Sequence, residues 1–337
     1  MKKALLWKKL DKNNVKCAVC AHGCLILPDR RGVCGVRKNE KGVLYSLVYN
    51  KAAAVNIDPI EKKPFFHFLP GSSALSFGTP GCNFRCLNCQ NWDLSQGPKL
   101  AEPIFSTDIT PQELVKQALE NNCASIAYTY SEPTIFIEYA LDTMKLARKK
   151  GLKNVWVSNG FMTPESFELI NGFIDANNID IKSFDEKFYQ ENCGARLAPV
   201  LETCKLMKKN NIWLEITTLI IPTLSDSPEM LEKIAMFIKT ELGAETPWHV
   251  SAFSPEISWR LGHLQPTSVE ILRQARVIGL KAGLKYVYIG NVPGEKGENT
   301  YCSKCGKLAI ARVNYHIERK DKKGKCARCG TNLDLIL

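Results

Sequence analysis

Short apolar runs alternate with amphipathic helical segments from about Ser72 to Val292, and this alternation constrains the fold more than any other feature of the chain. Short runs rich in β-branched and aromatic residues are typical of strands that are buried on both faces. We expect such strands at residues 74–77, 125–130, 154–157, 179–181, 213–221, 248–253 and 286–289. Strands joined by helices in this order predict an α/β fold, with a parallel sheet curled into a full or partial (β/α) TIM-like barrel.

The starts of several helices can be read directly. Thr110, Pro111 and Glu113 combine an N-cap, a proline at the first helical position and a capping-box glutamate. Parts of this pattern recur at Thr163-Pro164, at Ser227-Pro228 and at Thr267 with Glu270. The alternative fold is a flat doubly wound sheet, but the G-x-G-x-x-G motif that often follows the first strand of such a sheet is absent here.

Length and composition limit the class of protein. A chain of 337 residues can form one large core with appendages, because single barrels reach about 250 residues. The first ten residues have no apolar leader, and no run of about 18 apolar residues follows. We therefore expect a cytoplasmic protein with reduced thiols and no membrane contact, although the chain has 14 cysteines. The net charge of +11 either suits an acidic partner, such as nucleic acid, or solvates the surface.

Three cysteines follow the first predicted strand with the spacing C-x3-C-x2-C, at Cys82, Cys86 and Cys89. Closely spaced thiolates favour a soft metal, and iron–sulfur clusters are usually held by four of them. Three ligands would leave one iron open to a cofactor or substrate. The alternatives are a zinc site or a disulfide pair.

This spacing resembles the C-x3-C-x-aromatic-C signature of the radical S-adenosylmethionine (SAM) superfamily, although Asn88 stands at the aromatic position. The resemblance implies a site-differentiated [4Fe-4S] cluster that reductively cleaves SAM into methionine and a 5′-deoxyadenosyl radical, which removes hydrogen from a substrate. It also implies a one-electron donor such as flavodoxin or ferredoxin. The protein itself would position the cofactors and exclude competing reactions.

The resemblance also nominates residues that bind SAM. In this superfamily a Gly-Gly-Glu-Pro-like motif after the second strand binds the amino group, and Ser131-Glu132-Pro133 looks like a variant without its glycines. Glu132 would hold the ammonium by charge-assisted hydrogen bonds. The segment Asp180 to Ser183 is similar to one in glycyl-radical activating enzymes. The full set of predicted cofactor-binding residues is Ser131, Glu132, Ser158, Asn159, Lys182, Glu215 and His249. No catalytic residue is assigned. For each of these residues a helix cap, a turn or a satisfied core polar group is the alternative.

Two pairs of cysteines near the C-terminus have the spacing of a zinc ribbon. Cys302 and Cys305 form one C-x2-C knuckle, and Cys326 and Cys329 form the other. Zinc is favoured because paired knuckles make a closed tetrahedral site. A rubredoxin-like iron and an auxiliary cluster are the alternatives.

A second group of four cysteines, Cys17, Cys20, Cys24 and Cys34, lies near the N-terminus. Glycines between and after them indicate turns, as in a small module that a metal holds together. We expect a structural metal here, with an auxiliary cluster as the alternative. A proline-rich and charged bridge, from Ile57 to Gly71, then leads to the predicted barrel.

Taken together, these features resemble the radical SAM protein of the AmmeMemoRadiSam group, relatives of pyruvate formate-lyase activating enzymes. The likeness runs from Cys17 to about Val292. Together with the C-terminal cysteine knuckles, which lie outside this likeness, it predicts three parts: a Cys-rich module and bridge (1–70), the barrel (71–292) and a zinc-ribbon-like module (293–337). The likeness to activating enzymes implies a protein substrate with a glycine loop. Two other functions remain open, a radical SAM enzyme that modifies RNA and a non-catalytic metal-binding scaffold.

Overall fold

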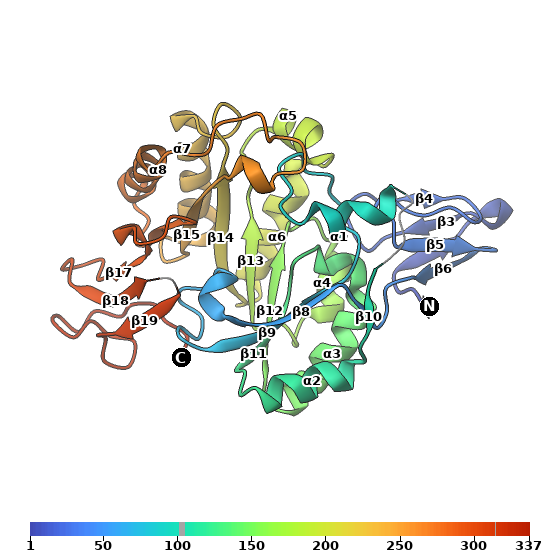
Figure 1. Ribbon diagram of the computed structural model, residues 1–337, viewed down its shortest axis with the longest axis horizontal. Coiled ribbons are helices and arrows are strands. Elements are labelled where there is room, and N and C mark those ends of the chain that lie inside the picture. Colours follow the sequence, from blue (N-terminus) through green and yellow to red (C-terminus); the bar gives the residue numbers. More distant parts are fainter. Residues whose placement is uncertain (101–104, 314) are drawn as a thin grey trace.

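A computed structural model describes residues 1–100, 105–313 and 315–337, and its centre is one eight-stranded sheet (Figure 1). The strand order is β16-β15-β14-β13-β12-β11-β9-β8. The strands from β9 to β16 are parallel and stand in chain order, and β8 runs antiparallel to β9. Their bounds are β8 (Ala54–Pro59), β9 (Ser73–Gly78), β11 (Ser125–Tyr128), β12 (Lys153–Ser158), β13 (Ala176–Asp180), β14 (Trp213–Ile220), β15 (Trp248–Ala252) and β16 (Val287–Gly290).

This arrangement confirms the α/β class and the parallel sheet. Within the described residues the sheet has two edges, β16 and β8, so closure into a full TIM barrel is not confirmed. The last three residues of strand β8 lie in the segment that the sequence indicated as a bridge, and β8 extends the sheet by pairing all along β9.

Helices connect the successive parallel strands and lie outside the sheet (Figure 1). They are α2 (Pro111–Glu120), α3 (Ile137–Lys149), α4 (Pro164–Ile170), α6 (Leu197–Lys209), α7 (Pro228–Phe237) and α8 (Val269–Ala282). The shorter segments in this part of the chain are η2 (Ile60–Lys62), α1 (Trp92–Gln96), η3 (Gly97–Lys99), η4 (Pro133–Phe136), α5 (Glu186–Phe188), η5 (Tyr189–Cys193), η6 (Ile238–Leu242) and η7 (Pro255–Ile257).

The predicted helix starts are confirmed at three of four positions. Thr110 and Glu113 form a complete capping box at α2, and Thr163 and Ser227 cap α4 and α7. The prediction at Thr267 was wrong, because Ser268 caps α8. The hydroxyl of Thr267 instead donates to the carbonyl of Ile220, which ties the loop before α8 to the end of β14.

The fourth predicted strand was misplaced by three residues at its start. The sequence indicated 179–181, but β13 begins at Ala176 and includes Asn177 and Asn178, which are fully buried. The amide of Asn178 donates to the carbonyl of Pro64 (2.7 Å) and accepts from the Thr217 hydroxyl (2.8 Å). A rule that looks for apolar runs does not find a strand whose buried side chains include two amides.

The core lies between the sheet and its helices and is rich in large aromatic residues. Phe77, Tyr128 and Trp156 are fully buried, on three neighbouring strands. Their ring centroids lie 5.2 Å apart for the first pair and 5.3 Å for the second. Each such side chain stabilises the fold by about 1.5–3 kcal/mol through burial. This packing fixes the strand ends that carry the polar side chains described below.

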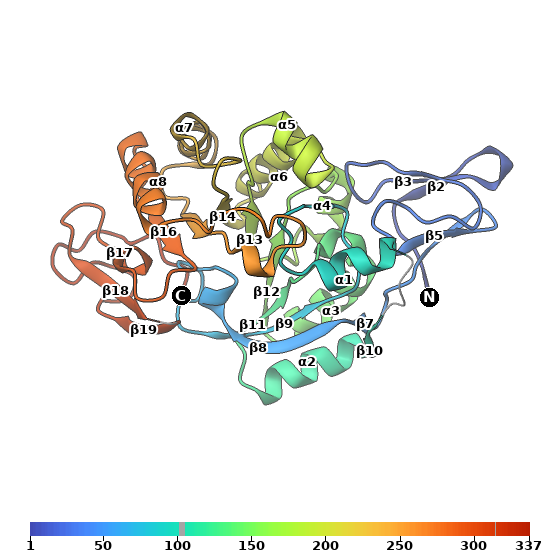
Figure 2. The same ribbon diagram turned by 45° about the horizontal axis from the view of Figure 1, so that its top comes forward.

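A small N-terminal module and a C-terminal ribbon lie at opposite ends of the molecule (Figures 1 and 2). The module has two three-stranded sheets, β1-β6-β5 and β2-β3-β4, and the ribbon has one, β17-β18-β19. The bounds are β1 (Lys2–Lys3), β2 (Trp7–Lys9), η1 (Asp11–Asn13), β3 (Val15–Cys17), β4 (Leu25–Ile26), β5 (Arg37–Glu40), β6 (Val43–Ser46), β7 (Lys51–Ala52), β10 (Thr107–Asp108), η8 (Lys296–Glu298), β17 (Thr300–Tyr301), β18 (Leu308–Val313) and β19 (His316–Arg319). Among the residues that the structure describes, no helix has the length and apolar character needed to cross a membrane.

Candidate functional site

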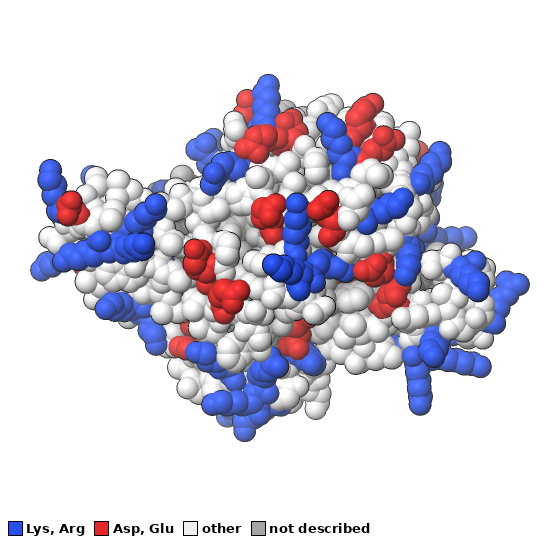
Figure 3. Space-filling model, turned by 180° about the vertical axis from the view of Figure 1, so that it is seen from behind, with Lys and Arg blue, Asp and Glu red and all other residues white. Residues whose placement is uncertain are grey.

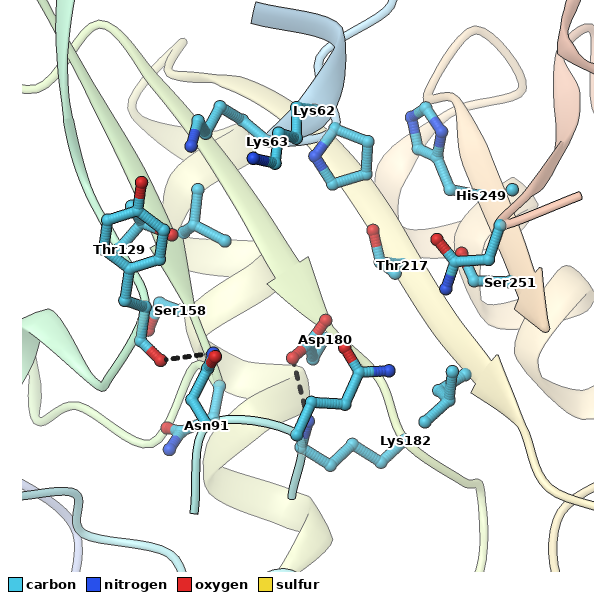
Figure 4. A pocket seen from close by; sticks show the side chains of 18 of the residues that line it. Lys62, Lys63, Asn91, Thr129, Ser158, Asp180, Lys182, Thr217, His249 and Ser251 are labelled. Atoms are coloured by element: carbon cyan, nitrogen blue, oxygen red, sulfur yellow. Dashed lines mark hydrogen bonds and ion pairs between the residues drawn. The ribbon is translucent and has the colours of Figure 1, made fainter. Parts of the chain in front are cut away.

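A cavity of about 570 Å³ opens at the carboxyl ends of the parallel strands. Figure 4 shows Asp180, Thr217, His249 and Ser251, which come from three neighbouring strands, pointing toward this space. Most of the residues predicted from the sequence line it, namely Cys82, Cys86, Cys89, Ser131, Glu132, Ser158, Asn159, Lys182 and His249. The fold therefore brings these widely separated residues together, as expected for the ends of parallel strands.

The three cysteines lie on a loop after β9 that is fixed by its backbone. The N–H groups of Arg85 and Leu87 donate to carbonyls of η5 at 2.9 Å each. On the other side, the carbonyls of Leu87 and Cys89 accept from residues 260 and 259. Cys86 is buried, whereas Cys82 and Cys89 are half-buried at the cavity wall. A rigid loop that presents three thiols to one cavity fits the donor set of an iron–sulfur cluster.

Glu132 is 2 % exposed and binds the ends of two strands together. Its Oε1 accepts from the N–H and hydroxyl of Thr134 (3.0 and 2.6 Å) and from the hydroxyl of Ser158 (2.8 Å). Among the described residues, its Oε2 accepts only from the N–H of Asn159 (2.8 Å). Burial raises the pKa of the Glu132 carboxyl. Because each carboxylate oxygen can accept about two hydrogen bonds, Oε2 keeps capacity for one more donor from the cavity.

Asn159 connects this carboxylate to the cysteine loop. Its amide nitrogen donates to Oδ1 of Asn83 (2.7 Å) and lies 3.9 Å from Sγ of Cys82. Its Oδ1 accepts from the N–H of Phe161 (3.0 Å). The predicted ligands Ser158 and Asn159 thus lie at the cavity, and both are also hydrogen-bonded within the protein.

Lys182 supplies a cation to the same cavity. Its Nζ lies 2.8 Å from Oδ2 of Asp180, an ion pair that is visible in Figure 4. Burial disfavours the ammonium, but the negative charge of Asp180 outweighs this effect and raises the pKa of Lys182 well above its ordinary value. The cavity therefore has a carboxylate at Glu132 and an ammonium at Lys182, which suits a ligand that carries both charges.

Glu215 does not line the cavity. Its carboxylate accepts from the N–H groups of Phe66 (3.0 Å) and His67 (2.9 Å), from Nε1 of Trp213 (3.0 Å) and from Nε2 of His249 (2.6 Å). Burial alone would raise the pKa of Glu215, but the hydrogen bond and the charge of His249 lower it to about 2. Glu215 thus anchors the segment after η2, and His249 is the member of this pair that reaches the cavity.

Sequence reasoning missed the wall formed by the bridge and the ribbon. Lys62, Lys63 and Phe66 line the cavity after β8, and Arg312 reaches it from β18. The Arg312 guanidinium is buried, lies 4.2 Å from the centroid of the Phe66 ring and donates to the carbonyl of Phe66 (2.8 Å). In the sequence, the unusual charge of the bridge was the one feature that could have indicated this wall. Its partner in the ribbon is 246 residues away in sequence, and no local pattern indicates it.

The four ribbon cysteines form a compact group. Sγ of Cys302 lies 3.6 Å from Sγ of Cys329, and Sγ of Cys305 lies 3.7 Å from Sγ of Cys326. All four sulfurs lie within 4.8 Å of one another. Four thiolates around one zinc ion, at about 2.3 Å each, stand about 3.8 Å apart. The ribbon is therefore a candidate site for a single tetrahedral ion.

Comparisons with known proteins agree with this geometry. Residues 77–238 match the family model of the radical SAM superfamily. The chain is 45% identical to the uncharacterized protein MJ0808 of Methanocaldococcus jannaschii, over the full length of both. It is 25% identical to the pyruvate formate-lyase-activating enzyme of Clostridium pasteurianum, over 50% of this chain and 72% of that protein.

Solved structures with the same fold include a radical SAM methyltransferase from Sphaerobacter thermophilus. The TM-score is 0.51 and the identity 13%, over 72% of this chain and 71% of that one. Streptococcus suis SuiB bound to the precursor peptide SuiA also has a TM-score of 0.51, with 14% identity over 70% of this chain and 52% of SuiB. At such low identity these structures show the fold alone. The family match and the loop of three cysteines lead to one conclusion, that the chain belongs to the radical SAM superfamily.

Proposed function

We propose that this protein is a radical SAM enzyme in which Cys82, Cys86 and Cys89 hold a site-differentiated [4Fe-4S] cluster. The observation that carries the proposal is the convergence of these thiols, Glu132 and Lys182 on one cavity at the ends of parallel strands. When bound, the cluster and SAM together supply reductive cleavage to methionine and a 5′-deoxyadenosyl radical that removes hydrogen from the substrate.

The residues of the chain would bind SAM and orient it beside the cluster. Glu132 has one free acceptor position on Oε2, which suits the ammonium of SAM. Lys182 suits the carboxylate of SAM, and Ser131, Ser158 and His249 lie where they can contact the remainder of the cofactor. Asn159, which follows β12, donates to Asn83 and thereby holds the Cys82 loop against the end of β12. Because Glu132 is already held by four hydrogen bonds from three residues, it does not need to reorganise when a ligand binds.

We propose a protein substrate, as in glycyl-radical activating enzymes, and a flavodoxin or ferredoxin as one-electron donor. Support comes from the similarity to pyruvate formate-lyase-activating enzymes, which extends over half of this chain. The alternative of an RNA substrate would favour a continuous basic surface. On the face shown in Figure 3, lysines and arginines are scattered, with acidic side chains among them in the centre. A non-catalytic scaffold would not need the charged side chains of Glu132 and Lys182 inside the cavity.

We further propose that the ribbon binds zinc, with Cys302, Cys305, Cys326 and Cys329 as ligands. Their spacing agrees with a zinc–thiolate tetrahedron. The ion would hold the ribbon together and thereby fix β18, which carries Arg312 to the cavity wall.

The test is anaerobic reconstitution, followed by dithionite and SAM, with 5′-deoxyadenosine measured by chromatography. We expect formation of 5′-deoxyadenosine by the wild type and none by the Cys82→Ala, Cys86→Ala, Cys89→Ala triple variant. Glu132→Gln should weaken SAM binding by about tenfold or more, because one charge-assisted contact contributes about 1.5–3 kcal/mol. Glu168→Gln, an exposed position on α4, is the matched control. Equal SAM affinity for both glutamine variants would contradict the role of Glu132, and a wild type that carries iron yet never cleaves SAM would contradict the function.

A further inference from the structure

The four N-terminal cysteines surround a second, much smaller cavity. Cys17 ends β3, Cys20 and Cys24 follow on the turn to β4, and Cys34 precedes β5. All four line a space of about 10 Å³ for the centre of a water-sized sphere. The remaining wall is mainly apolar, from Val19, Ile26, Val33 and Ile135. Four thiols around one enclosed space indicate a built metal site rather than scattered buried cysteines.

The spacing of these thiols differs from that of the ribbon. Among the residues that the structure describes, the ribbon alone has three or more such ligand atoms within 4.8 Å of one another. The N-terminal thiols are therefore more widely spread, and a water-sized sphere fits between them. The thiols of the Cys82 loop share this wider spacing. A single zinc ion at about 2.3 Å from each sulfur leaves no such space at its centre.

A cubane cluster explains this spread. Its four irons and four sulfides stand between the thiolates, so the thiolates lie farther apart than around one ion. The mainly apolar wall limits solvent exposure, which is among the features that tune iron–sulfur clusters. We propose that Cys17, Cys20, Cys24 and Cys34 hold a second [4Fe-4S] cluster, with all four irons ligated by protein.

The N-terminal cysteine site is in contact with the loop that carries Cys82. A Cβ atom on Gly81 would lie 2.8 Å from the carbonyl oxygen of Cys34, so the two loops pass each other in close contact. Nε2 of His22 lies 2.8 Å from the carbonyl oxygen of Asn83. Gly81 and Asn83 flank Cys82 on its two sides. The N-terminal site therefore lies directly behind the loop that holds the proposed SAM-binding cluster.

The decisive experiment counts iron, sulfide and zinc in the full chain after anaerobic reconstitution. The Cys82→Ala, Cys86→Ala, Cys89→Ala variant leaves the N-terminal thiols intact. We expect this variant to keep about four irons and one zinc per chain, and the wild type to hold about eight irons. Mössbauer spectra of the variant should show a [4Fe-4S] cluster. Cys305→Ser with Cys329→Ser is the matched control, which should lose zinc and keep all iron.

Two results would overturn the proposal. A Cys82-loop variant with no iron and two zinc ions per chain would show that the N-terminal site binds zinc. A variant with one zinc and no other metal would show that the N-terminal thiols bind none. The variant lacks the Cys82 ligands, so any cluster that it keeps is held by the N-terminal thiols. Its iron content can therefore be measured whether or not the wild type cleaves SAM. Failure of the proposed function and failure of this inference therefore give different results.

Discussion

At the scale of single residues, the hydrogen-bond partners of a buried charged side chain determine whether that side chain faces the cavity. Glu132 and Glu215 both follow or lie within central strands and are both buried. Glu132 keeps an acceptor position toward the cavity, whereas the donors around Glu215 turn its carboxylate toward the bridge. By sequence position alone, Glu132 and Glu215 are similar candidates for cofactor binding. The hydrogen-bond partners distinguish them.

Glu215→Gln should reduce the acid sensitivity of the fold. Its pKa falls from an ordinary value of 4.5 to about 2 in the folded protein. A carboxyl group with a lowered pKa adds stability above its ordinary pKa, and this stability is lost as the pH falls from about 4.5 toward about 2. We expect the variant to be less stable at pH 7 by about 3 kcal/mol and to lose less on acidification through this window. Anaerobic chemical denaturation at several pH values measures both effects. An identical pH dependence in the two proteins would contradict this role.

At the scale of elements, helix starts follow from local sequence, but the residue that forms the cap can be misjudged by one position. Thr110 and Ser227 cap the helices that they precede. Thr267 has the same chemistry, but it points to Ile220, and the next residue, Ser268, caps α8. A tertiary hydrogen bond therefore overrode the local pattern.

Thr110→Ala should lower the free energy of unfolding by about 1 kcal/mol. The Thr110 hydroxyl accepts from the N–H of Glu113 (3.2 Å), and the Glu113 carboxylate accepts from the N–H of Thr110 (2.6 Å), so the variant loses half of a reciprocal cap. Chemical denaturation measures the change. Thr107→Ala, at an exposed position on β10, is the control and should be nearly neutral. Altered SAM affinity in Thr110→Ala would contradict a purely local effect.

At the scale of the whole molecule, buried polar contacts hold both cysteine modules on the central sheet. Nη2 of Arg37 lies 2.6 Å from both carboxylate oxygens of Glu138, which joins the N-terminal module to α3. Arg312 joins the ribbon to the segment after η2. Both arginines are at most 3 % exposed. The modules are thus fixed to the sheet by charged groups that water does not reach.

Arg37→Met should destabilise the protein by about 3–5 kcal/mol, because it leaves the Glu138 carboxylate buried without its partner. The double variant Arg37→Met with Glu138→Leu should recover most of this loss, since it removes both charges. Denaturation and limited proteolysis of the N-terminal module would report the effect. A double variant no more stable than Arg37→Met would show that the ion pair does more than neutralise a buried charge.

Loss of the zinc that we propose for the ribbon should loosen the cavity wall. Cys305→Ser with Cys329→Ser should lose one zinc and loosen β18, and with it Arg312. We expect hydrogen exchange at the amides of Phe66 and His67 to rise several-fold, because Arg312 and Glu215 together fix this segment. Exchange that rises only within residues 300–337 would contradict this coupling.

The sequence by itself determined the features that depend on neighbours in the chain. These are the alternation of strands and helices, the caps at Thr110, Thr163 and Ser227, and the spacing of the three groups of cysteines. Only the tertiary structure decided that the described part of the sheet has its edges at β16 and β8, that Glu215 faces the bridge, and that Arg312 lines the cavity. Periodicity and motif spacing report contacts within a few residues. The decisive partners lie 101 residues apart for Arg37 and Glu138, and 246 for Arg312 and Phe66, so folding alone brings them together.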